Sequence, residues 1–330
     1  MRLCNTLKKH GDVSLMKKVV LFFTFLLFFV SSVFAQFDSQ ISHYTFFPAS
    51  INPAMVGETG MIQIIGFQRI NYIGMNGGQV TNFGVNSPLR IKGTNHGLGL
   101  RFVIAEQGEL YSNQNAYIQY AYKHKTSIGT FGVGVDIGFL SVGFDGTKVE
   151  MPELGEYHDS SDSKIPSGKV SGTGFDLNVG ALYSFKKGFV GVSYAHVNKL
   201  SVSWDDKNTI NFPGILYVMG TYGFDIPDTK LVFRPNTLLK TDFAAVDWDL
   251  GARLEYNEKL WGGLSYRIGN AVVFMVGVNI FGGLSASVAY DLPASKMILG
   301  TFGSFELLLE YNFEFLFNKQ TKKYKSVRIL

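Results

Sequence analysis

Long stretches in which apolar and polar residues alternate are the feature that most limits how this chain folds. From Phe131 to Phe139 every odd position is apolar, and the even positions are glycine or aspartate. From Trp248 to Tyr256 one face is again apolar, whereas the other carries glycine and charged residues. Alternation with a period of two over nine residues predicts β-strands whose two faces meet different surroundings.

The length of these strands separates a membrane barrel from a soluble sandwich. Soluble strands average about five or six residues, whereas several here reach nine to twelve, which is close to the length that crosses a bilayer. Many apolar faces begin or end in an aromatic residue, as the aromatic girdles of a membrane barrel do. We therefore predict an all-β fold, a transmembrane antiparallel β-barrel. A soluble barrel with its apolar faces turned inward is the alternative.

The alternation predicts about fourteen strands, an even number that is usual for bacterial barrels. They cover residues 60–70, 78–86, 96–106, 111–122, 129–142, 173–184, 187–196, 214–224, 229–240, 246–256, 259–268, 271–280, 283–291 and 304–314. The longest gaps, 143–172, 197–213 and 292–303, all follow odd-numbered strands, where external loops are expected. Only the gap 87–95, which follows an even-numbered strand, is too long for a periplasmic turn.

The N-terminal residues have the character of a secretory signal peptide. Lys17 and Lys18 precede an apolar run that ends in small residues at Ala35, and Met16 would serve as an alternative start. Export and a membrane barrel predict the cell outer membrane as the location. The predicted division is a signal peptide at 1–35, an N-terminal extended segment at 36–59, an outer-membrane β-barrel at 60–315 and a basic periplasmic tail at 316–330.

Charge and cysteine content exclude several classes of function. The whole chain has 30 basic and 26 acidic residues, of which residues 1–35 hold five and one, so that 25 of each sign remain. This balance does not favour binding to nucleic acid. The single cysteine, Cys4, lies in the predicted leader, so disulfides and thiolate chemistry are excluded from the rest of the chain.

Residue patterns typical of enzymes are missing from the sequence. There is no His-Glu-x-x-His motif, no Gly-x-Ser-x-Gly elbow and no phosphate-binding loop, so we expect neither enzymatic activity nor a cofactor. One acidic loop carries Glu153, Glu156, Asp159 and Asp162, which are oxygen ligands of the kind that bind Ca²⁺. Their spacing is not that of an EF-hand. We predict a solvated external loop, with a weak calcium site as the alternative.

Charged residues on the polar strand faces are predicted to line the lumen. They are Arg69, Arg101, Asp136, Asp176, Asp249, Arg253, Glu255, Arg267, Glu306 and Glu310. Two interpretations stay open: these residues pair with one another and keep the interior wet, or they bind a plug or a passing partner.

The segment before the first strand is unusual. Pro48 and Pro53 interrupt residues 43–57 and disfavour a helix or a central strand, yet the segment is too apolar for a solvated linker. The strand count places it in the periplasm. We predict that it folds back into the periplasmic mouth of the barrel as a partial plug, with docking to a periplasmic partner as the rival.

Asn52-Pro53-Ala54 before the first predicted strand and Trp261-Gly-Gly-Leu-Ser-Tyr-Arg267 near the end of the chain, taken together, resemble the PorP/SprF family of Bacteroidetes outer-membrane proteins. The resemblance covers nearly all of the chain after the leader, and the family usually has histidine where Phe305 stands. The matching residues that we expect to act in plugging or docking are Phe47, Pro48, Asn52, Pro53, Arg69, Trp261, Tyr266, Arg267, Tyr290, Asp291 and Glu306.

The resemblance implies a non-enzymatic component of the type IX secretion system. Such proteins are linked to the periplasmic ring components of that system and to secretion or surface attachment of a large protein with a C-terminal sorting domain. In gliding species the partner is an adhesin of gliding motility. Outer-membrane lipid is the remaining expected partner. The alternative function is an outer-membrane channel for small or hydrophobic solutes.

Overall fold

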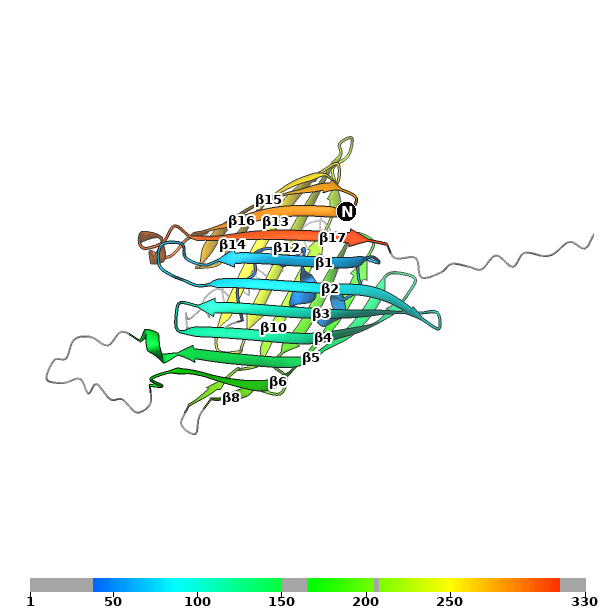
Figure 1. Cartoon of the computed structure of the whole chain (residues 1–330). Helices are drawn as coiled ribbons and strands as arrows, with labels where there is room; N and C mark the ends of the chain where they lie inside the picture. The colour runs from blue at the N-terminus through cyan, green and yellow to red at the C-terminus, as the bar shows by residue number, and fades with distance from the viewer. Residues whose placement is uncertain (1–37, 150–164, 205–207, 315–330) are drawn as a thin grey trace, which may run out of the picture.

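Fourteen strands form one closed antiparallel barrel in a computed structural model that describes residues 38–149, 165–204 and 208–314 (Figure 1). The barrel strands are β1 (Ile62–Ile70), β2 (Gln79–Ile91), β3 (Thr94–Gln107), β4 (Tyr111–Lys125), β5 (Thr130–Asp145), β6 (Lys169–Phe185), β7 (Gly188–Ala195), β10 (Ile215–Tyr222), β12 (Leu231–Thr241), β13 (Val246–Tyr256), β14 (Leu260–Arg267), β15 (Ala271–Phe281), β16 (Leu284–Pro293) and β17 (Ser304–Phe313).

Closure of the barrel follows from the pairing of its first and last strands. β1 pairs with both β2 and β17, and β10 bridges β7 and β12. Every barrel strand therefore has a neighbour on each side, and the sheet closes without an edge strand. The predicted fold class and strand count are confirmed.

The two ends of the barrel differ in their connections. At the turn end, β2 and β3 are joined by Lys92 and Gly93 alone, both with positive φ (49° and 86°). At the loop end, β5 and β6 are separated by residues 146–168, and η3 (Gly146–Lys148) begins this connection. Short turns face the periplasm in outer-membrane barrels, so the loop end, on the left in Figure 1, is external.

The predicted long gap at residues 87–95 is wrong. β2 continues to Ile91 and β3 begins at Thr94, although Pro88 interrupts the sequence pattern. Pairing of β2 with β1 stops at Asn86, so one side of β2 is free from there onward. A proline, which has no N–H to donate, is tolerated on such a free side.

Short strands and a 3-10 helix lie in the connections at both ends of the barrel. In the long connection after β7, β8 (Ser201–Ser203) and β9 (Thr209–Asn211) form a hairpin. η4 (Lys296–Leu299) lies between β16 and β17, and β11 (Phe224–Asp225) pairs with β12 at the turn end. In the part of the chain that the structure describes, no helix is long and apolar enough to cross a membrane.

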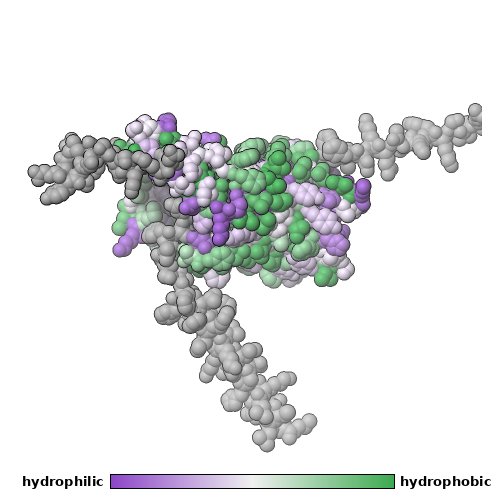
Figure 2. Space-filling model, turned by 90° about the horizontal axis from the view of Figure 1, so that it is seen from below, coloured by the Kyte–Doolittle hydropathy of each residue, from purple (hydrophilic) through white to green (hydrophobic). Residues whose placement is uncertain are grey.

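The alternation sorts side chains between the outer surface and the lumen. On β5, Phe131, Val133 and Phe139 point outward and are 43–59% exposed, whereas Asp136 is 1% exposed. Figure 2 shows hydrophobic residues gathered over the middle of the visible wall. The expected difference between the two faces of the strands is confirmed.

The lumen is occupied by the chain itself. The luminal segment, residues 38–58, begins at the loop end, where Asp38 contacts His196 just after β7. It ends at the turn end, where Glu58 pairs with Lys123 of β4. It contains η1 (Pro48–Ser50) and η2 (Pro53–Met55), seen in blue inside the barrel in Figure 1.

This segment differs in two ways from the expectation. It is not confined to the periplasmic mouth, because it crosses the lumen from end to end. It is not extended throughout either, because Pro48 and Pro53 each begin a short 3-10 turn, a position where proline's fixed φ and missing N–H cost nothing.

Candidate functional site

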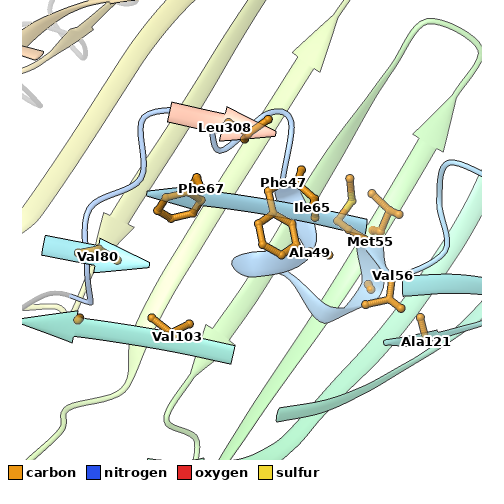
Figure 3. Close-up of a cluster of buried hydrophobic side chains, with 13 residues drawn as sticks. Phe47, Ala49, Met55, Val56, Ile65, Phe67, Val80, Val103, Ala121 and Leu308 are labelled. Atoms are coloured by element: carbon orange, nitrogen blue, oxygen red, sulfur yellow. The ribbon is translucent and has the colours of Figure 1, made fainter. Parts of the chain in front are cut away.

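Apolar packing holds the middle of the luminal segment against the barrel wall. Phe47, Met55 and Val56 are 0–4% exposed and pack in one cluster with side chains of β1, β2, β3 and β17, among them Ile65 and Leu308 (Figure 3). Complete burial of a side chain of this size contributes about 1.5–3 kcal/mol relative to exposure in water. The segment therefore adds a hydrophobic core to a barrel whose own apolar faces point outward.

A buried ionic cluster lies at the loop end of the lumen. Asp291 of β16 accepts from Nη2 of Arg69 (2.9 Å) and from Nη1 of Arg267 (2.8 Å). Arg69 also pairs with Glu306 at 3.3 Å, and Arg267 pairs with Asp249 at 3.3 Å. None of these side chains is more than 5% exposed. Buried ions are tolerated when their remaining hydrogen-bonding positions are filled.

The luminal segment fills those positions. Glu306 accepts from the backbone N–H groups of Ser42 (2.9 Å) and His43 (3.0 Å). It also contacts Nδ1 of His43 at 2.6 Å. The Ser42 hydroxyl donates to Asp291 at 2.8 Å and accepts from Arg69 at 3.0 Å. Three of the four hydrogen bonds at Glu306 thus come from the segment and one from Arg69.

An aromatic clamp holds the segment next to this cluster. The ring of Phe46 stacks on Trp261 of β14, with centroids 4.4 Å apart and planes at 20°. The guanidinium of Arg253 lies 4.4 Å from the centre of the Phe46 ring and donates to the hydroxyl of Thr45 at 2.9 Å. Cation–π contacts of this kind are worth about 0.5–2 kcal/mol.

Asn52 fixes the segment against β6 and β7. Its side-chain oxygen accepts from the N–H of Ala54 (2.9 Å), which caps η2. Its amide nitrogen donates to the carbonyl oxygens of Ala181 (3.0 Å) and Val192 (3.2 Å). A Cβ at Gly180 would lie 2.0 Å from this side-chain oxygen.

Glycine on the inner strand faces therefore has a role that the alternation alone did not reveal. A Cβ at Gly134 would lie 2.4 Å from the backbone nitrogen of Ala54, and one at Gly84 would lie 2.3 Å from the ring of Phe47. Glycine lets another backbone or ring approach a strand closely. These positions make room for the luminal segment.

Polar side chains of the wall also bind the backbone of the segment. Arg101 donates to the carbonyl of Ser50 (2.7 Å), Gln119 to that of Ala49 (2.9 Å) and Ser193 to that of Ile51 (2.9 Å). The lumen-facing charges thus pair with one another and also hold a plug, which combines the two interpretations left open by the sequence.

An ion pair anchors the first described residue of the segment. His196 contacts Asp38 at 3.2 Å and Asp176 at 2.9 Å, and Tyr217 donates to Asp38 at 3.0 Å. Burial opposes the charged imidazolium, but attraction to Asp38 and Asp176 outweighs it and raises the pKa of His196 to about 10. His196 is therefore positively charged at neutral pH.

The comparisons with known proteins agree with this architecture. A family model described as the type IX secretion system membrane protein PorP/SprF matches residues 33–311. The chain belongs to the PorP/SprF family. It is a membrane protein of type IX secretion and, as a transmembrane β-barrel, lies in the outer membrane. A search of the curated proteins finds no match.

Solved structures similar to this PorP/SprF protein include three from other bacteria. The toluene transporter TbuX of Ralstonia pickettii is 14% identical, with a TM-score of 0.47 over 81% of this chain and 92% of that chain. Omp33 of Acinetobacter baumannii is 9% identical, with a TM-score of 0.46 over 77% and 98%. A FadL homologue of Pseudomonas aeruginosa is 11% identical, with a TM-score of 0.45 over 81% and 94%.

The motif residues of this PorP/SprF protein fall into two sets. Nine take part in the segment or in its contacts with the wall: Phe47, Pro48, Asn52, Pro53, Arg69, Trp261, Arg267, Asp291 and Glu306. The other two, Tyr266 and Tyr290, lie on the outer surface and are 46% and 37% exposed, as is Phe305, the cross-strand partner of Tyr290, at 37%. The structure gives these two tyrosines no place in plugging.

Sequence reasoning missed several contacts of the site. No partner was predicted for Ser42, His43 or Asn86, although His43 begins the predicted plug at residues 43–57, and only the fold brings them to the cluster or to the end of the segment. In the described residues, no group of three or more His, Cys, Asp and Glu side chains is arranged to hold a metal ion. The acidic loop with Glu153 to Asp162, the predicted leader and the basic tail lie outside the described residues.

Proposed function

We propose that this protein is a non-enzymatic docking barrel of type IX secretion. It supports secretion or surface attachment of one large partner protein that carries a C-terminal sorting domain, and in a gliding species that partner is an adhesin. The observation that carries the proposal is the luminal segment, which crosses the lumen and is fixed by Glu306, Asp291 and Trp261. A free solute channel would require this segment to leave.

The turn end offers a point of contact for the periplasmic ring components. A recess of about 670 Å³ opens there beside Phe46 and Trp261, and it is also lined by Arg234, Arg253 and Glu255. The recess combines an aromatic stack with two arginines, and aromatic residues and arginine are enriched in protein interfaces. This feature supports a partner on the periplasmic side.

Deletion of the gene followed by surface proteomics tests the proposal. We expect one large surface protein to be lost, while uptake of toluene, used as a hydrophobic test solute, stays unchanged. Reintroducing the wild-type gene should restore the surface protein. An unchanged surface proteome together with reduced solute uptake would instead favour the channel.

A further inference from the structure

A cavity remains beside the luminal segment at the external end of the barrel. This outer vestibule has a volume of about 290 Å³ and is bounded by Asp38 and Ile51 of the segment, by the inner faces of β1 to β5, and by Phe212 after β9. Pockets that bind small ligands begin at about 300 Å³. The vestibule is therefore close to the lower limit for such a pocket and suits a short segment or a single side chain.

Three polar atoms of this vestibule are buried without a hydrogen-bond partner among the described residues. They are the side-chain oxygens of Asn82 and Asn115 and the Nε of Arg101. Asn82 pairs across the sheet with Val103, which pairs with Asn115, so the two amide oxygens flank one apolar side chain. Buried polar groups nearly always have partners, and Asn82 is only 2% exposed. Two acceptors and one donor are thus available to hydrogen-bond a ligand or water.

The same wall already binds one polypeptide. Arg101 donates to the carbonyl of Ser50, and Gln119 donates to that of Ala49. Asn82 and Asn115 lie on the same wall, nearer the loop end, where the luminal segment does not cover β2 to β4. A peptide backbone supplies N–H donors for the two amide oxygens and a carbonyl for Arg101. Val80, Val103 and Leu140 offer apolar contacts between these polar groups.

We infer that the outer vestibule binds a short extended peptide, uncharged and carrying apolar side chains, that belongs to the surface partner and enters from the loop end. This inference rests on the proposed docking function and assigns the part of the barrel that recognises the partner. The luminal segment supplies the floor of the site, and the vestibule wall supplies the hydrogen bonds.

Substitutions in the vestibule test this assignment. Asn82→Leu removes one acceptor, and Ala105→Phe fills the cavity from β3, where Ala105 is 1% exposed. The matched control is Ile104→Phe, because Ile104 points outward and is 50% exposed. We expect both vestibule variants to lower the amount of the partner on the cell surface about tenfold or more, the effect of roughly one lost buried hydrogen bond, while the control keeps it.

Folding of the variants is checked by the mobility of unheated samples on gels and by urea unfolding. Asn82→Leu is expected to fold at least as stably as the wild type, because it removes an unpaired buried acceptor. If both folded variants display the partner at the wild-type level while gene deletion abolishes it, the vestibule is not the site and the docking function stands. If gene deletion leaves the partner in place, the docking function itself is wrong.

A thiol probe measures occupancy directly. The chain has a single cysteine, Cys4, so Asn113→Cys in the vestibule and Gln114→Cys on the outer face can be compared with biotin-maleimide after Cys4→Ser. We expect Cys at 113 to react in the purified barrel and to be protected on cells that display the partner, whereas Cys at 114 reacts alike in both. Equal reaction at 113 in both settings, or none in the purified barrel, overturns the inference.

Discussion

The backbone N–H of His43 donates to Oε1 of Glu306 at 3.0 Å, although 263 residues separate them. The contact ties the segment before the first strand to the start of the last strand. Those strands, β1 and β17, pair with each other to close the barrel. The luminal segment is therefore anchored at the strand pair that closes the barrel.

Replacing Glu306 should destabilise the barrel. Glu306→Ala leaves Arg69 without one of its two carboxylate partners and leaves the N–H groups of Ser42 and His43 unpaired. Removing one partner of a buried ion pair costs about 3–5 kcal/mol. We expect a lower urea midpoint in lipid vesicles. Glu106→Ala, at an exposed acid of β3, is the matched control, and equal midpoints for the two variants would contradict the role of Glu306.

Removing the luminal segment should open the lumen. A chain lacking residues 38–57 loses Phe47, Met55 and Val56 from the interior, so that water and ions enter the barrel. We expect a larger single-channel conductance in planar bilayers than for the wild type. The deleted chain must first show the gel mobility of a folded barrel. A folded deletion variant with unchanged conductance would mean that other parts of the chain block the lumen.

A single methyl group at Gly180 should displace the segment. Gly180→Ala places Cβ 2.0 Å from the side-chain oxygen of Asn52, and overpacking of this kind costs about 1–3 kcal/mol. We expect faster cleavage of the segment by added chymotrypsin, which can cut after Tyr44 and Phe46, and a lower urea midpoint. Gly262→Ala, whose Cβ would have its nearest neighbour at 3.9 Å, should behave as the wild type. Equal protease sensitivity of both variants would argue against close packing at Gly180.

The contribution of His196 to stability should depend on pH. Its pKa is raised from 6.5 to about 10 in the folded chain, so the stabilisation is fully present below pH 6.5 and is lost as the pH rises through 10. The difference in urea midpoint between the wild type and His196→Gln should therefore be large at pH 6 and should shrink toward pH 10. His124→Gln, at an exposed histidine, is the control. A pH-independent difference would show that His196 acts without its charge.

The sequence predicted the barrel because the barrel rests on local repetition. Residues such as Phe131 to Phe139 carry the whole signal for a strand with one lipid-facing side in nine consecutive positions. The family phrases likewise pointed to Arg69, Arg267, Asp291 and Glu306 without showing that they touch. The predicted gap at residues 87–95 was wrong, because whether β2 can continue through Pro88 depends on where its pairing with β1 stops.

By itself, the sequence determined the fold class, the approximate strand count and which strand face meets lipid, since each of these follows from a period of two along neighbouring residues. The sequence also predicted a partial plug at the periplasmic mouth, and only the tertiary structure decided that the segment crosses the whole lumen. Closing the barrel brings Ser42 to Glu306, Phe46 to Trp261 and Asn52 to Gly180, pairs that are separated by more than a hundred residues. The path of the luminal segment is set by burial and hydrogen bonding against the whole inner wall, and no local pattern records it.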